Sequence, residues 1–195
     1  AGIGTIGLID NDIVNLSNIH RQSLFNSKDI KKTKVSVAAK KLKEINPFTK
    51  IKIYRARLNK NNIEKIIKDY ELIIDGSDNF KTKFLISDYC KKLKKKLVTG
   101  AISKFDGHIF TFDFKDKSTA SLKNFYQEKN ISDDTLNCEF EGVLGTTASI
   151  VGTTQANEAL KMIMEIGQNL KNQILILDLL NLNFRKVKFK NFKIK

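Results

Sequence analysis

The chain has 195 residues, of which 41% are hydrophobic, with two cysteines and a formal net charge of +14. This length predicts one domain, residues 1–195, with enough chain for a substantial core. The longest apolar runs are well short of the roughly 18 residues that a membrane-spanning helix needs, which argues against a membrane partner. Cys90 and Cys138 are too few for a disulfide scaffold, and they favour a reducing, cytoplasmic location.

The positive charge by itself invites a nucleic-acid interpretation, but its composition argues against one. Only Arg21, Arg55, Arg57 and Arg185 of the 35 basic residues are arginines. Surfaces that read bases depend on arginine forks, whereas the lysines here are spread along the chain among many Asn and Ile residues. We therefore predict no nucleic-acid partner, while a positive field would still attract ATP or an acidic protein.

The first half of the chain alternates apolar strands with amphipathic helices. The apolar spacing predicts strands at Thr5–Asp10, Ile51–Tyr54, Leu72–Asp75 and Leu97–Thr99. Between them it predicts helices at Ser27–Asn46, Asn61–Lys68 and Phe80–Lys92, with Asn46-Pro47 ending the first of these. Such alternation is typical of an α/β fold with a parallel sheet.

The second half departs from this alternation. His108–Phe114 reads as an antiparallel strand, and a polar stretch from Asp113 to Asn137 predicts a long loop. A helix from Thr146 to Ile166 should end near Gly167, followed by strands at Ile174–Asp178 and Phe184–Phe189. The fold class predicted is therefore α/β, Rossmann-like and doubly wound, with a mainly parallel sheet and antiparallel strands in the C-terminal half.

The segment Leu8–Gln22, LIDNDIVNLSNIHRQ, carries the clearest chemical signal. Its apolar strand ends on Asp10, and a carboxylate at the tip of a parallel strand is where a doubly wound fold binds a ribose. Ser17, Asn18, Arg21 and Gln22 follow within six residues, and an arginine fork suits phosphate oxygens. The segment therefore predicts a nucleotide site.

Three further groups can be interpreted in two ways. Lys34 lies early in the next predicted helix, where an exposed lysine is common. The run from Asp75 to Asn79, DGSDN, offers two carboxylates that suit Mg²⁺ with phosphates, or simply a turn followed by a helix cap. Cys138, at the end of a polar loop, is either a reactive thiol or a small buried residue.

The order of these motifs resembles that of the ThiF/MoeB/HesA family, bacterial enzymes similar to the adenylating half of ubiquitin-activating enzymes. The resemblance covers nearly the whole chain. It is carried by LIDNDIVNLSNIHRQ, by Lys34 in KKTKVSVAAKKLKEINP, and then by IIDGSDNF, VTGAISKFDGHIFTF, CEFEGVLGTTASIVGTTQANEALKMI and FRKVKF.

The resemblance implies an ATP-dependent adenylyltransferase. Such enzymes bind ATP with Mg²⁺ and activate the C-terminal Gly-Gly tail of a ubiquitin-like sulfur carrier, of MoaD or ThiS type, as an acyl-adenylate in molybdopterin or thiamine biosynthesis. Family members are commonly homodimers. The resemblance implies that Asp10 binds the ribose and that Gln22 lines the site. It implies phosphate binding by Ser17, Asn18, Arg21 and Lys34. It further implies that Asp78, beside Asn79, ligates Mg²⁺ and that Cys138 takes part in sulfur transfer.

The chain also departs from the family pattern. The glycine-rich loop G-x-G-G-x-G, the first strand and an N-terminal arginine that the partner subunit contributes would all lie upstream of Ala1, so we expect a fragment of a longer protein. The first of two zinc-binding C-x-x-C pairs falls on Ser118 to Ser121, STAS. Because serine supplies no thiolate, we predict no structural zinc.

Two other functions stay open. A degenerate family member would bind the carrier without activating it. An NAD-dependent oxidoreductase is compatible with Asp10, but it does not account for Arg21, Lys34 and Asp78 together.

Overall fold

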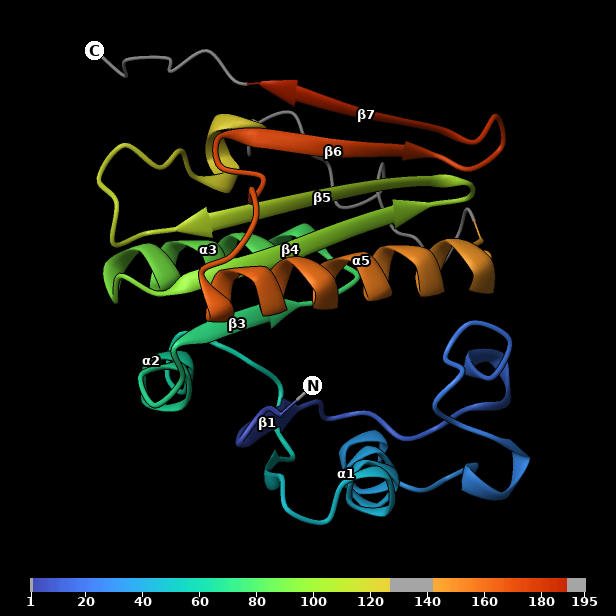
Figure 1. Ribbon diagram of the computed structural model, residues 1–195. Coiled ribbons are helices and arrows are strands. Elements are labelled where there is room, and N and C mark those ends of the chain that lie inside the picture. The colour runs from blue at the N-terminus through green and yellow to red at the C-terminus, as the bar shows by residue number, and fades with distance from the viewer. Residues whose placement is uncertain (1, 127–141, 189–195) are drawn as a thin grey trace. The chain divides into compact units, whose positions relative to one another are not determined.

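The computed structural model describes residues 2–126 and 142–188 (Figure 1). The chain divides into two units, one up to Asn59 and the other from Lys60 onward, and each is described by itself. No helix within these described residues has both the length and the apolar character needed to cross a membrane.

The first unit is a two-stranded parallel sheet with one long helix. Strand β1 (Thr5–Ile9) pairs in parallel with β2 (Lys50–Tyr54), and helix α1 (Lys34–Ile45) packs against both strands. The strands were predicted within one residue of these bounds. The buried apolar side chains of this unit are Val14, Val35, Val37, Ala38 and Ala39.

The predicted helix from Ser27 to Asn46 is wrong in its first part. A short 3-10 helix, η2 (Ser27–Asp29), comes first, and α1 begins only at Lys34. Asn26 caps η2 by accepting the N–H of Lys28, and Lys31 then adopts a left-handed conformation with φ of 67°. A residue in the left-handed conformation cannot continue a right-handed helix. The helix is therefore interrupted at Lys31, although the spacing of apolar side chains continues through this segment.

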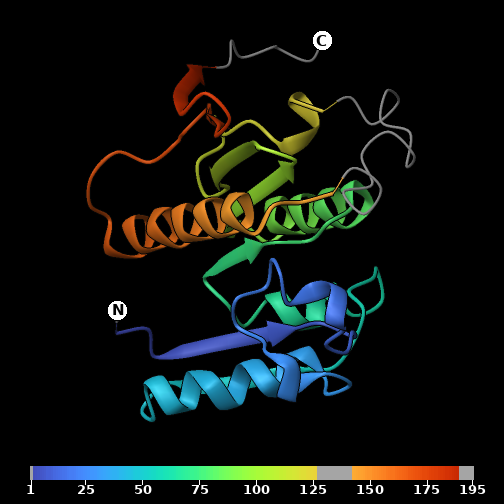
Figure 2. The ribbon, with the colours of Figure 1, turned by 90° about the vertical axis from the view of Figure 1, so that its right-hand side faces the viewer.

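The second unit is a five-stranded sheet with a helix on each face. The strand order is β3 (Leu72–Asp75), β4 (Lys96–Ser103), β5 (Asp106–Asp113), β6 (Gln173–Asp178) and β7 (Asn183–Lys188). Helix α5 (Gly145–Met164) crosses one face and α3 (Phe80–Lys92) lies on the other, as Figure 2 shows. Two short helices, α2 (Ile63–Ile67) and η3 (Leu122–Asn124), contact α3.

One hydrophobic core cluster of this unit lies between the sheet and α5. Its buried members are Val98, Ile109, Val151, Ala159, Met162 and Leu177 from β4, β5, β6 and α5, and Leu170 from the segment before β6. Gly107 is needed here, because a Cβ at that position would lie only 2.5 Å from Val151 Cγ2. The missing side chain lets α5 approach β5 closely.

The expectation of a mainly parallel sheet is wrong for the described strands. Two pairings, β1–β2 and β3–β4, are parallel, whereas β4–β5, β5–β6 and β6–β7 are antiparallel. Strand β4 also runs past its predicted end at Thr99, because all eight of its residues pair with β5 from Lys96 to Ser103. Gly100 and the three residues after it are therefore part of the strand.

Other predicted elements are confirmed closely. The bounds of β3 and α3 match their predictions, and α5 ends two residues early because Glu165 turns left-handed with φ of 56°. The predicted loop from Asp113 contains η3 before Tyr126, and its remainder lies outside the described residues.

Candidate functional site

The loop after β1 is organised by Asp10, the carboxylate at the strand tip. The Asp10 backbone N–H continues the ladder by donating to the carbonyl of Tyr54 at 3.2 Å. Its carboxylate Oδ1 accepts the N–H of Asp12 at 2.8 Å, which folds the chain sharply after the strand. This is the position at a carboxyl-terminal strand end where ligands bind in open α/β sheets.

Asn18 shapes the next part of this loop. It closes the short 3-10 helix η1 (Leu16–Asn18) and is only 7% exposed. Its amide oxygen accepts the N–H of Asn15 at 3.2 Å, in a capping arrangement that satisfies an orphan donor. The structure therefore gives Asn18 a local folding role, and its contact with phosphate stays a prediction.

Arg21 is held by the backbone of the same loop. Its Nη1 donates to the carbonyl of Ser17 at 2.7 Å and lies 3.1 Å from His20 Nε2. This bond fixes one corner of a guanidinium that has five donors in a planar fork. The Arg21 side chain is thus oriented before any ligand binds, so less side-chain entropy is lost when it binds an anion.

Gln22 follows with an unsatisfied acceptor. Its backbone N–H donates to the carbonyl of Asn18 at 2.9 Å. Its side-chain Oε1 is buried, and within the described residues it meets no hydrogen-bond donor. A buried acceptor without a partner costs free energy, so this atom is the natural place for a donor from a ligand.

Lys34 returns to the same loop from the first turn of α1. Its backbone N–H donates to the carbonyl of Asp12 at 3.0 Å, and its Nζ lies 3.2 Å from Asp12 Oδ2. The Asp12 side chain is 57% exposed, whereas that of Lys34 is 12% exposed. Because the Asp12 carboxylate is exposed to water, a phosphate can replace it at the Lys34 ammonium without leaving a buried charge unpaired. Asp12 is a member of this cluster that we did not predict, although an Asx-rich loop was visible in the sequence.

Asp75 is the centre of a buried network in the second unit. Its carboxylate Oδ1 accepts the backbone N–H and the hydroxyl of Ser77, at 2.8 and 2.6 Å. The other oxygen, Oδ2, accepts from Lys83 Nζ at 3.2 Å and from Thr99 Oγ1 at 2.6 Å. Asp75 is 2% exposed, so four protein donors take the place of water around it.

Lys83 and Gln155 complete the network from two different helices. Lys83 Nζ also donates to the carbonyl of Gly100, and Gln155 Nε2 donates to the carbonyl of Asp75 at 2.9 Å. A Cβ on Gly100 would lie 2.8 Å from the Gln155 amide group, so the glycine makes room for it. Neither helix residue was predicted, and spacing alone offered no signal for Gln155, which lies 80 positions from Asp75.

Asp78 and Asn79 behave differently from Asp75. Asn79 caps α3 by accepting the N–H of Thr82 at 2.9 Å, which confirms the turn-and-cap interpretation of this segment. Asp78 is exposed, and its Oδ1 accepts from Asn79 Nδ2 at 3.1 Å. The two carboxylates of the DGSDN run therefore separate into a buried structural group and an accessible one that can take a cation.

The cysteine and zinc predictions concern other parts of the chain. Cys138 lies outside the described residues. Cys90 is fully buried, and burial raises the pKa of its thiol to about 12, which keeps it protonated at neutral pH. Ser118 and Ser121 bond to Asp116 and Asn124, and no group of three His, Cys, Asp or Glu side chains suited to a metal occurs over residues 2–126 and 142–188.

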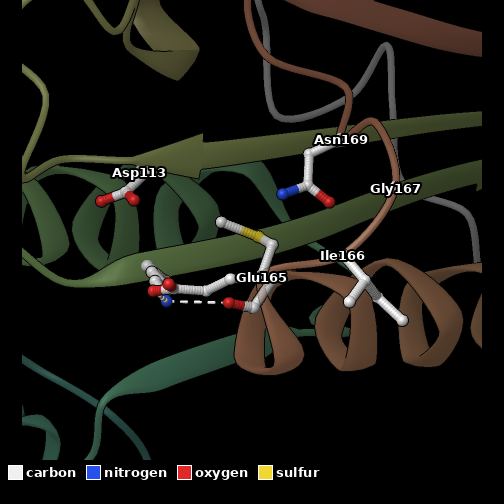
Figure 3. A pocket seen from close by; sticks show the side chains of 7 residues that line it. Asp113, Glu165, Ile166, Gly167 and Asn169 are labelled. Atoms are coloured by element: carbon white, nitrogen blue, oxygen red, sulfur yellow. Dashed lines mark hydrogen bonds and ion pairs between the residues drawn. The ribbon is translucent and has the colours of Figure 1, made fainter.

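A cavity of about 260 Å³ lies at the C-terminal end of α5 (Figure 3). Among its lining residues is Lys96, whose Nζ donates to the Met162 carbonyl at 2.8 Å and pairs with Glu71 and Glu165 at 3.3 and 3.6 Å. Protein oxygens surround this buried ammonium, which fastens the end of α5 to β4. None of the predicted site residues lines the cavity.

Curated relatives have similar sequences over nearly the whole chain. The probable molybdopterin-synthase adenylyltransferase of Porphyra purpurea is 40% identical over 189 residues, which cover 96% of this chain and 49% of that protein. The sulfur carrier protein adenylyltransferase of Thermus thermophilus is 35% identical over 190 residues, covering 96% of this chain and 70% of that protein. The chain thus spans about half the length of the first relative and 70% of the second.

The solved structures show the same fold. The crystal structure of E. coli MccB with ATP matches 99% of this chain and 58% of its own, with a TM-score of 0.80 and 16% sequence identity. At that identity the likeness concerns the α/β fold with its mixed sheet. The ThiF family model, in turn, matches residues 1–194. The motif order, the fold and this match agree, and the chain belongs to the ThiF family.

Proposed function

We propose that the chain carries the adenylation site of an ATP-dependent adenylyltransferase that activates the C-terminal glycine of a ubiquitin-like sulfur carrier. The observation that carries this proposal is the 35% identity to the Thermus sulfur carrier protein adenylyltransferase over 70% of its length. We further propose that residues 1–195 act as one doubly wound, Rossmann-like adenylation domain. Because the names of three relatives refer to molybdopterin synthase, we favour a MoaD-type carrier and molybdopterin biosynthesis.

The nucleotide would be held by the loop of the first unit. Asp10 would accept the ribose hydroxyls, while Arg21 and Lys34 would bind phosphate oxygens, together with Ser17 and Asn18. Gln22 would line the site, and its buried Oε1 meets no hydrogen-bond donor within the described residues. The Arg21 guanidinium is already bonded to the Ser17 carbonyl, and the Lys34 ammonium is already bonded to Asp12. These bonds support a phosphate site, because both cations need little rearrangement to bind phosphate.

Asp78 would supply the oxygen ligand for Mg²⁺, with Asn79 beside it. The exposed carboxylate of Asp78 fits this role, since Mg²⁺ in nucleotide sites is commonly bound through one or two carboxylates and substrate phosphates. When bound, the ion would neutralise phosphate charge. Asp75, with both oxygens occupied by protein donors, does not fit.

The reaction asks the protein for positioning and charge. The carrier's terminal carboxylate attacks the α-phosphorus of ATP, a new C–O–P bond forms, and the bond to the leaving pyrophosphate breaks. Charge shifts onto phosphate oxygens, which cationic groups such as Arg21 and Lys34 stabilise. No protein nucleophile is needed in this step, so the proposed sulfur-transfer thiol of Cys138 would act only afterwards.

ATP–pyrophosphate exchange tests the proposal directly. Radiolabelled pyrophosphate should enter ATP only when Mg²⁺ and a carrier ending in Gly-Gly are present, and a carrier lacking its last glycine is the matched control. The assay should be run with MoaD-type and ThiS-type carriers. It should also be run on a version of the chain carrying the glycine-rich segment that the family resemblance implies.

Failure of exchange in every version would overturn the proposal. Carrier binding without ATP turnover would favour the degenerate binding module instead, and binding of a nicotinamide cofactor would favour an oxidoreductase. Sedimentation of the same preparation would test the homodimer that we propose, and cell fractionation would test the cytoplasmic location.

A further inference from the structure

The turn that carries Asp78 is short and is fixed at both ends. Only Gly76, Ser77 and Asp78 separate the buried carboxylate of Asp75 from Asn79, the cap of α3. At one end Ser77 bonds twice to Asp75, and at the other Asn79 accepts the N–H of Thr82. The position of the Asp78 carboxylate therefore depends on what holds Asp75.

Asp75 is held by donors from three other elements. Lys83 reaches it from α3, Thr99 from β4 and Gln155 from α5. All four residues are at most 6% exposed, so water does not compete for these bonds. Lys83 links the elements further, because its ammonium also bonds to the Gly100 carbonyl on β4. The Asp75 carboxylate is thus held from α3 and β4, and its backbone carbonyl is held from α5.

We propose that Asp75, Lys83, Thr99 and Gln155 form a buried anchor whose function is to position Asp78, so that Lys83 and Thr99 are positioning residues of the site. This inference rests on the proposed function for the role of Asp78. The hydrogen bonds to Asp75 are by themselves the reason to expect that the anchor sets the conformation of the turn at Gly76–Asp78. In this arrangement the metal affinity of the site is set by residues that never touch the metal.

Thr99→Val tests the anchor with minimal disturbance of packing. Valine keeps the shape of threonine but removes the hydroxyl that donates to Asp75 Oδ2. Thr99→Ser is the rescue variant, because it keeps the hydroxyl and loses a methyl group. Thr111→Val is the matched control, since Thr111 is equally buried in neighbouring β5, at 3% exposed against 2% for Thr99, and lies outside the anchor.

Two measurements on the full chain separate positioning from mere stability. The first is the rate of amide hydrogen exchange of Ser77, whose N–H donates to the Asp75 carboxylate. Thr99→Val should raise this rate about tenfold, because one charge-assisted hydrogen bond to the carboxylate is lost. The second is the Mg²⁺ concentration that half-saturates pyrophosphate exchange, which should rise about fivefold in Thr99→Val. In Thr99→Ser and Thr111→Val both quantities should stay near those of the unmodified chain.

The outcomes are distinguishable. Equal Ser77 exchange rates in Thr99→Val and Thr111→Val would overturn the anchor, whatever the activity. Faster Ser77 exchange in Thr99→Val with an unchanged Mg²⁺ requirement would overturn the positioning of Asp78. Failure of pyrophosphate exchange in every version of the chain, including the one with the glycine-rich segment, would overturn the proposed function, and Ser77 exchange would then still decide whether the anchor sets the turn.

Discussion

Two Lys–Asp pairs in this protein have the same length and opposite surroundings. Lys34 Nζ and Asp12 Oδ2 lie 3.2 Å apart in the first unit, and Lys83 Nζ and Asp75 Oδ2 lie 3.2 Å apart in the second. The Asp12 side chain is 57% exposed, whereas that of Asp75 is 1% exposed. The first pair can exchange its carboxylate for a phosphate at little cost. The second cannot lose either partner without leaving a buried charge.

Breaking the buried pair should have the largest effect. Lys83→Met leaves the Asp75 carboxylate uncompensated in the interior and should lower the free energy of unfolding by about 3–5 kcal/mol. Lys34→Met, the matched change in the exposed pair, should lower it by less than about 1 kcal/mol. Urea denaturation of both variants measures the difference. Equal losses in the two variants would contradict the contrast between the pairs.

Lys34 should matter for activity instead of stability. Lys34→Ala removes a cation that the proposed reaction places on phosphate oxygens, so exchange of pyrophosphate should fall about a hundredfold. Asp12→Asn is the control, because it releases Lys34 from its carboxylate while keeping the ammonium. Steady-state kinetics should show that this control retains most of the activity. Full activity in Lys34→Ala would remove the lysine from the site.

Gly100 tests how closely the anchor is packed. Gly100→Ala places a methyl group 2.8 Å from the Gln155 amide and should destabilise the fold by about 1–3 kcal/mol. Gly152→Ala is the matched control in α5, where a Cβ meets no neighbouring atom within 4 Å. Alanine is a better helix former than glycine, so that control should gain about 0.5–1 kcal/mol. Thermal unfolding of the two variants should therefore shift in opposite directions.

The smallest effect concerns His108, whose imidazole Nδ1 lies 2.8 Å from the hydroxyl of Tyr126. Burial lowers the pKa of His108 in the folded chain, so between that value and about 6.5 the unfolded chain binds more protons. Stability should therefore fall as the pH drops from 7 towards 5. His108→Gln should make this decline shallower, as measured by urea denaturation at each pH. An identical pH dependence in the variant would show that His108 contributes nothing to it.

The predictable part of the fold was the part governed by local patterns. β3 and α3 were predicted within their observed bounds, because an apolar run and an amphipathic spacing are visible in neighbouring residues. The start of α1 was missed, since the left-handed backbone of Lys31 leaves no trace in the apolar spacing. The extension of β4 was also missed, because its last four residues owe their strand conformation to pairing with β5.

The sequence by itself determined the family, the kinds of element along the chain and the residue types offered to a nucleotide. Only the tertiary structure decided that Asp75 is buried and Asp78 accessible, although they lie three positions apart in one run. Burial is decided by what packs from elsewhere, and here the deciding residues come from α3, β4 and a helix 80 positions away. A charged side chain becomes an anchor when distant segments exclude water from it, and it stays available to a ligand when they do not.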